Sequence, residues 1–226
     1  MVSKSGQMAI NGLKEQVADL LFPRYCLGCR QEGEWLCDEC LTALPNKKRR
    51  LVLPVSSGVV EVRVLFDYEQ SLIDRIITTL KYNFAFDLSR TIHQLINREE
   101  LSAQADNRPA VLVPVPLHRR RYLWRGFNQA EIIAEALAVT NPALSVCPDL
   151  LRRVIYHKPQ VGQTQKSREH NVIGAFQLNL DRLSDNWGKR IILVDDVLTT
   201  GSTLSECAGT LKTAGFADIS CFVLAA

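Results

Sequence analysis

The sequence predicts an α/β fold in which helices flank a mainly parallel sheet and a small four-cysteine element precedes the domain. Apolar strand-like segments alternate with amphipathic helical segments from about residue 59 to the end of the chain. The largely apolar run 190–194 is typical of a strand buried inside a parallel sheet. Cysteines occupy four of the 15 positions from 26 to 40, which sets the N-terminal element apart.

Composition is that of an ordinary soluble globular protein, which excludes disordered, collagen-like and coiled-coil chains. Of the 226 residues, 46% are hydrophobic and 23% are charged, and the net charge is +3. No apolar run approaches the ~20 residues that a membrane span needs. Lys14, Glu15 and Asp19 interrupt the N-terminal apolar stretch, which argues against a secretory signal. We therefore expect a cytoplasmic protein with two domains, residues 1–50 and 51–226.

The first half of the chain opens with an amphipathic helix at 8–21, where apolar residues recur at helical spacing and Pro23 ends the pattern. The cysteine element follows, and the basic segment 45–50 is expected to be its linker to the domain. The next expected elements are a strand at 62–68, a helix at 72–82 and a helix at 87–101.

In the second half, the clearest helix is expected at 128–139, where Asn128 can cap the N-terminus and Glu131 lies three positions on. The polar, basic segment 155–171 has no periodicity, and long loops of this kind are often functional lids. The remaining segments are a strand at 110–116, mixed signals at 144–154, the strand at 190–194, a helix at 203–214 and a strand at 219–224.

Cys26-x-x-Cys29 and Cys37-x-x-Cys40 are two pairs of thiols separated by seven residues. Each pair can grip one metal, and four thiolates complete the closed tetrahedron of a structural zinc site. Gly28 permits a tight turn in the first pair. So small a segment buries little core, so the metal would supply its folding energy. A redox or iron–sulfur role is the alternative.

Two acidic residues, Asp195 and Asp196, follow the apolar strand, and a hydroxyl-rich loop with Gly201 leads into the next helix. Ligands of parallel α/β sheets bind at the carboxyl ends of strands, and the N–H groups at a helix start attract phosphate. The carboxylates would accept hydrogen bonds from sugar hydroxyls or hold Mg²⁺. A capped turn without a ligand explains one acid and one hydroxyl only. The hydroxyl residues are Thr199, Thr200, Ser202 and Thr203.

Positive charge is concentrated in residues 113–171, which carry nine basic and four acidic side chains. Arginines there are interleaved with aromatic residues between 118 and 127, a mixture that suits single-stranded nucleic acid. A pyrophosphate pocket, or a surface turn with Trp124 and Phe127 in the core, would explain the same residues. The candidate nucleic-acid contacts are Arg119, Arg120, Arg121, Trp124, Lys158 and Arg168.

The segment from Ile191 to Thr203 resembles the signature of type I phosphoribosyltransferases, which bind phosphoribosyl pyrophosphate. The order of further motifs, together with the cysteine pairs, is similar to the ComF family of competence-associated proteins, which includes GntX-like members. This resemblance spans about residues 17–224. The further motifs are Leu80-Lys81-Tyr82, Val113–Arg121, Arg125–Gln129, Gln160, Arg168, Asn171 and Ala175-Phe176. One departure is Asn83–Asp87, which replaces a glycine-rich stretch that family members often carry after the Lys-Tyr pair.

The resemblance implies a type I phosphoribosyltransferase-like domain that binds phosphoribosyl pyrophosphate with Mg²⁺ and acts on incoming single-stranded DNA during natural transformation, with other competence proteins as partners. A working phosphoribosyltransferase, in which Asp195 and Asp196 are catalytic, is the alternative, and a sensor of phosphoribosyl pyrophosphate is a third. The sequence favours binding because no residue set identifies an acceptor base. The implied ligand-binding residues are Val197, Leu198, Thr199, Thr200, Gly201, Ser202, Thr203, Lys81 and Arg125.

Overall fold

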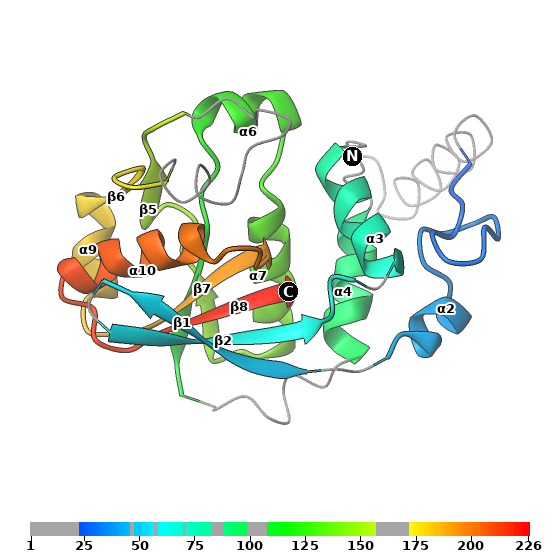
Figure 1. Ribbon diagram of the computed structural model, residues 1–226, viewed down its shortest axis with the longest axis horizontal. Helices are drawn as coiled ribbons and strands as arrows, with labels where there is room; N and C mark the ends of the chain where they lie inside the picture. Colours follow the sequence, from blue (N-terminus) through cyan, green and yellow to red (C-terminus); the bar gives the residue numbers. More distant parts are fainter. Residues whose placement is uncertain are drawn as a thin grey trace, which may run out of the picture. The chain divides into compact units, whose positions relative to one another are not determined.

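A computed structural model describes residues 23–45, 48–56, 58–69, 71–82, 88–98, 108–156 and 172–226 (Figure 1). The predicted helix at 8–21, together with the predicted contacts Lys158 and Arg168, lies outside the described residues. The chain divides into two compact units, Met1–Leu44 and Pro45–Ala226.

The described part of the first unit is built around the cysteine pairs. Tyr25 and Glu32 form an antiparallel bridge that closes the first pair into a loop, and helix α2 (Asp38–Ala43) carries the last cysteine. Cys26 and Leu36 are fully buried in this small unit.

The second unit contains a six-stranded sheet in the order β1-β2-β8-β7-β3-β4. Adjacent strands in this sheet are parallel, except that the edge strand β1 runs antiparallel to β2. A separate two-stranded sheet pairs β5 (Leu151–Arg153) with β6 (Phe176–Leu178). The six strands are β1 (Arg49–Val55), β2 (Gly58–Phe66), β3 (Ala110–Pro114), β4 (Leu144–Val146), β7 (Arg190–Val197) and β8 (Ile219–Ala225).

Helices cover both faces of this sheet, as Figure 1 shows. Helix α7 (Gln129–Thr140) packs on β3, β4 and β7, and helix α10 (Ser202–Thr213) packs on the opposite face against β1, β7 and β8. Helix α4 packs against α7. The other helices are α3 (Ser71–Tyr82), α4 (Ser89–Arg98), α6 (Arg119–Arg125), a 3₁₀ turn at Leu180–Arg182 and α9 (Leu183–Asn186).

The main core lies between the sheet and α10, and its residues explain which way the functional side chains point. Ile191 and Leu193 of β7 pack in this core with Leu204 and Leu211 of α10. Because successive strand residues point to opposite faces, Asp195 shares the α10 face with Leu193, whereas Asp196 faces α7.

The predicted fold class is confirmed by the mainly parallel sheet, the helices on both faces and the N-terminal cysteine cluster. Several local predictions differ from the structure. Arg49 and Arg50 of the expected linker are the first residues of β1, and the mixed segment 144–154 contains both β4 and β5. Helix α6 and strand β6 were not predicted, because α6 is short and polar and β6 has only three residues.

Candidate functional site

The loop between β7 and α10 has the geometry of a phosphate cradle. Gly201 is the N-cap of α10 with a φ of 77°, and as a glycine it adds no side chain of its own to the start of the helix. The Thr200 and Ser202 hydroxyls lie 2.9 Å apart, and the Ser202 N–H donates to Thr200 Oγ1 at 3.4 Å. An α-helix leaves N–H groups of its first turn without helical partners, and these favour an anion.

The remaining loop residues anchor the cradle to the sheet. Val197 ends β7, and the Leu198 N–H donates to the Ala225 carbonyl at 2.9 Å. Thr199 is exposed, while Thr203 lies in the first turn of α10. The predicted phosphate-binding residues 197–203 therefore form one continuous turn at the carboxyl end of a central strand.

Strand β1 packs directly against this turn. A Cβ atom on Gly201 would collide with Leu53 Cδ1, the end of a flexible side chain that would have to shift, and the positive φ of Gly201 separately favours glycine. The Ser205 hydroxyl donates to the Pro54 carbonyl at 2.9 Å and fixes β1 to α10. This contact was not anticipated from the sequence, because no strand was predicted at residues 51–55.

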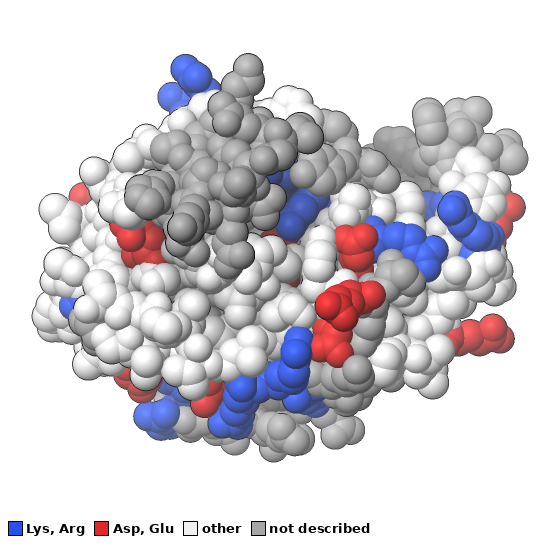
Figure 2. Space-filling model, in the orientation of Figure 1, with Lys and Arg blue, Asp and Glu red and all other residues white. Residues whose placement is uncertain are grey.

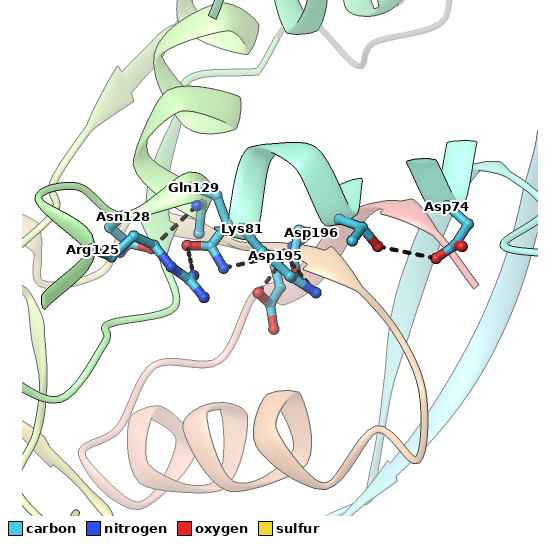
Figure 3. A network of polar contacts seen from close by, with 9 residues as sticks. Asp74, Lys81, Arg125, Asn128, Gln129, Asp195 and Asp196 are labelled. Carbon is cyan, nitrogen blue, oxygen red and sulfur yellow. Dashed lines mark hydrogen bonds and ion pairs between the residues drawn. The ribbon is translucent and has the colours of Figure 1, made fainter. Parts of the chain in front are cut away.

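Asp196 lies in a network of polar contacts on the α7 face (Figure 3). Its Oδ2 atom accepts hydrogen bonds from Lys81 Nζ at 3.0 Å and from Gln129 Nε2 at 3.2 Å. Arg125, only 2% exposed, donates in turn to Gln129 Oε1. Lys81 thus contacts the acidic loop directly, whereas Arg125 reaches Asp196 through Gln129, which ends the Arg125–Gln129 motif but was not among the candidate site residues. Ligand contacts at Lys81 and Arg125 stay predictions.

Asp195 has a different environment from its neighbour. Its carboxylate points toward α10 in Figure 3 and accepts the Asp196 backbone N–H at 2.9 Å. Burial, followed by the nearby negative charge of Asp196, raises the pKa of Asp195 to about 7, although Lys81 and Arg153 oppose the rise. Because a cation or a hydroxyl donor would stabilise the ionised form, this carboxylate is suited to meet a sugar hydroxyl, a magnesium ion or a developing positive charge.

The four cysteines of the first unit fit a tetrahedral metal site. Their sulfur atoms all lie within 4.8 Å of one another. Cys26 Sγ and Cys29 Sγ each lie 3.6 Å from Cys37 Sγ. Zinc–thiolate bonds of about 2.3 Å in a tetrahedron would separate the sulfurs by about 3.8 Å, so the cluster matches the donor set and size that zinc prefers.

The electrostatics of these thiols also fit a metal site. Burial opposes ionisation of Cys26, but backbone N–H groups of Cys37, Cys29 and Gly28 lower its pKa to about 6. The contact with Cys37 and burial raise the pKa of Cys40 to about 12. One thiolate thus hinders the ionisation of its neighbours, which a divalent metal would relieve. Gly28 lies in the turn of the first pair as expected but has no positive φ, and the left-handed residue is Arg30, directly after that pair, with a φ of 70°.

The basic, aromatic segment forms helix α6, which the His118 imidazole caps by accepting the Arg120 N–H. Trp124 is 58% exposed, whereas Phe127 is only 7% exposed. The alternative that placed both rings in the core is therefore wrong for Trp124. Arg119 and Arg120 are exposed, and Arg121 is half-buried.

A tyrosine that the sequence reasoning missed extends this segment into a surface. Tyr156, 37% exposed, lies 5.0 Å from the His118 ring, and the Arg120 guanidinium lies 5.5 Å from the Tyr156 ring centre. We define the α6 surface as Arg119, Arg120, Trp124 and Tyr156. Its signal in the sequence was an aromatic residue beside the expected loop, but its pairing with α6 depends on the tertiary fold.

Comparisons with known proteins agree with these features. The family described as phosphoribosyl transferase domain matches residues 92–226. The chain is 31% identical to competence protein F of Haemophilus influenzae, over 99% of the chain and 92% of that protein. It is 29% identical to competence protein ComFC of Streptococcus pneumoniae, over 85% of the chain and 81% of that protein. It is 28% identical to DNA utilization protein YhgH of Escherichia coli, over 83% of the chain and 76% of that protein.

Among the residues that the structure describes, no helix has the length and apolar character needed to cross a membrane.

Proposed function

The chain belongs to the phosphoribosyl transferase domain family and, within it, to the ComF family of competence proteins, and we propose from this membership that it acts in DNA uptake. In this proposal it binds single-stranded DNA on the α6 surface and a phosphoribosyl pyrophosphate-like ligand at the loop between β7 and α10. The observation that carries the proposal is the cradle at Thr200–Ser202, with two carboxylates at the end of the same strand.

The proposed ligand pose follows from the charges around the cradle. The 5′-phosphate would rest on the first turn of α10, and Asp195 would accept a hydrogen bond from a ribose hydroxyl. The pyrophosphate would compete with Asp196 for Lys81, whose ammonium is 3.0 Å from that carboxylate. Magnesium would bind mainly through oxygens of the ligand, as it does with other phosphates, with Asp195 as a protein ligand.

The proposed DNA contact uses charge and stacking together. Exposed arginines on α6 would neutralise phosphates, while Trp124 and Tyr156 offer aromatic faces to bases. The cysteine cluster would hold a structural zinc ion, because four thiolates leave no open position for a substrate. We also propose a cytoplasmic location, where reducing conditions keep these thiols free to bind metal, and other competence proteins as partners.

Calorimetric titration with phosphoribosyl pyrophosphate and Mg²⁺ tests the ligand, and repetition with a DNA single strand tests the second partner. We expect Asp195→Asn and Ser202→Ala each to weaken phosphoribosyl pyrophosphate binding at least tenfold, while Asp181→Asn, an exposed carboxylate on the same domain, leaves it unchanged. Wild-type protein that binds neither ligand would refute the proposal.

A Mg²⁺-dependent phosphoribosyltransferase acting on an unidentified acceptor is the second candidate. It is favoured by the complete acid pair, in which one carboxylate faces each side of β7. In such an enzyme Asp195 would stabilise positive charge at the sugar as pyrophosphate leaves. Release of pyrophosphate in the presence of nucleobases or other acceptors would support this candidate, and Asp195→Asn should abolish that release.

A further inference from the structure

A groove leads away from the cradle along α10. Its first compartment, about 330 Å³, adjoins Thr200–Ser202 and lies between Leu53–Pro54 of β1 and Val172–Ile173. A second compartment, about 400 Å³, continues along the helix as far as Thr213. Both compartments are lined by Ser205 and Glu206, so they adjoin each other along α10, and the first adjoins the expected phosphate position.

The groove has the length and lining for a nucleoside. At a rise of 1.5 Å per residue, Gly209 lies about 10 Å and Thr213 about 17 Å along the helix from Ser202. Of the described residues that line the groove, Glu206 alone is charged, and the others are hydroxyl, glycine and apolar residues. Figure 2 accordingly shows a largely uncharged surface over α10. This lining suits a sugar and a base but offers no cation to a second phosphate.

An open path beside the phosphate has a chemical consequence. A closed cradle accepts only a terminal phosphate, because a second ester substituent would collide with its wall. Here the first compartment begins at Thr200 and Gly201 themselves, so a phosphodiester fits with its second substituent lying between β1 and Ile173. Pro54 and Ile173 provide apolar contacts for a base, and the Glu206 carboxylate, whose Oε1 atom accepts the Gly174 N–H at 2.7 Å, can accept a further hydrogen bond from an N–H group of a base.

The acid pair limits which end of a strand can enter. Asp195 lies on the α10 face, the same side of the sheet as the groove, and an ionised carboxylate only accepts hydrogen bonds. A free sugar hydroxyl satisfies it, whereas a phosphate on that hydroxyl would place like charges together. The nucleotide in the cradle must therefore be the last one at the 3′ side.

We propose that the cradle and the groove together bind the 3′-terminal nucleotide of a DNA single strand. Its 5′ phosphodiester lies on Thr200–Ser202, its free 3′-hydroxyl faces Asp195, and the preceding nucleoside lies along α10. The inference rests on the proposed use of this turn as a phosphate cradle, and it adds that the nucleic acid and the phosphoribosyl ligand share one site.

Calorimetry on the full-length protein with four small probes tests this assignment. The probes are phosphoribosyl pyrophosphate with Mg²⁺, thymidine 5′-monophosphate, the dinucleotide TpT and its 3′-phosphorylated form. We expect TpT to bind within tenfold of the monophosphate, and the 3′-phosphate to weaken TpT at least tenfold. If phosphoribosyl pyrophosphate binds and TpT does not, the inference fails and the proposed function stands; if phosphoribosyl pyrophosphate does not bind, the proposed ligand site itself fails.

Two variants locate the dinucleotide. Ser205→Phe fills the junction of the compartments and should remove TpT binding while phosphoribosyl pyrophosphate still binds. Val139→Phe adds the same ring to an exposed position of α7, on the other face of the sheet, and should change neither. The 3′-phosphate comparison uses wild-type protein, so the test stands even if Ser205→Phe fails to fold. Equal affinity for both forms of TpT, or a tenfold preference for UpU, would overturn the assignment to a DNA 3′ end.

Discussion

Replacing Asp195 by asparagine should stabilise the ligand-free protein at alkaline pH and do so less at acid pH. The wild-type pKa rises from an ordinary value of 3.8 to about 7, chiefly through burial. A carboxyl group with a raised pKa holds its proton more tightly in the folded state than in the unfolded state. Its contribution to stability is therefore complete below about pH 4 and is lost as the pH rises through 7.

The size of the effect follows from this pH window. Each pH unit between the two pKa values changes the free energy of unfolding by about 1.36 kcal/mol, so moving from pH 5 to pH 7 removes at most about 2.7 kcal/mol. Asp195 is only partly buried, so water screens the charge of its carboxylate and reduces the effect. We therefore expect Asp195→Asn to raise the free energy of unfolding by about 1–2 kcal/mol more at pH 8 than at pH 5.

Urea unfolding followed by circular dichroism at the two pH values measures this difference. Any loss of metal from the cysteine cluster at low pH affects both proteins alike and cancels in the comparison. Asp181→Asn, at an exposed position, is the matched control and should show no such gain. If Asp195→Asn is destabilising at both pH values, or stabilises the protein equally at both, burial does not raise the pKa of Asp195 as described above.

Three further outcomes are expected. Gly201→Ala should destabilise the domain by about 1–2 kcal/mol through its positive φ, with an added clash against Leu53 that Leu53→Ala should relieve in a double-mutant cycle measured by urea unfolding. Elemental analysis should find one zinc ion per chain, which Cys37→Ala loses and Cys147→Ala keeps; iron in place of zinc would contradict the site. In fluorescence anisotropy at several salt concentrations, the slope of log affinity against log salt is about 0.7 per single-strand phosphate. Replacing residues 119–121 by alanine should reduce this slope by the amount that two to three phosphate contacts contribute. Trp124→Ala should instead weaken DNA binding by about 1–3 kcal/mol with little change in the slope.

The sequence was sufficient for the fold class and for the acidic loop because both depend on short-range patterns. Alternating apolar segments reveal buried parallel strands, and a strand followed by Asp195, Asp196 and a hydroxyl-rich turn is itself a local motif. The same holds for the two cysteine pairs, whose spacing fixes which thiols can meet. For these features the local chain carries the geometry.

The features that the sequence did not reveal depend on contacts between distant segments. Leu53 packs against Gly201, and Gln129 contacts Asp196, across separations of 148 and 67 residues that no local pattern encodes. Tyr156 likewise joins α6 only in the tertiary structure. The first two residues of β1 are arginines and were read as the end of a linker, yet an edge strand can carry charge on its exposed face.

Helix α6 connects the two proposed binding sites, because neighbouring residues on it face in opposite directions. Trp124 is exposed on the α6 surface, while Arg125 is buried and donates to Gln129, which in turn donates to Asp196. A DNA strand that shifts α6 would therefore move a hydrogen bond to the carboxylate that holds Lys81.

Such a connection must act in both directions, since a coupling free energy is reciprocal. For a DNA strand that carries a 3′-phosphate, we expect the strand and phosphoribosyl pyrophosphate to change each other's affinity by the same factor, and Gln129→Leu to bring that factor close to one while each ligand still binds alone. A strand blocked by a 3′-phosphate, which should be excluded from the cradle, separates this coupling from direct competition. If that strand leaves phosphoribosyl pyrophosphate affinity unchanged in wild-type protein, α6 carries no signal to Asp196, and the hydrogen bonds through Gln129 serve only to hold the two helices in place.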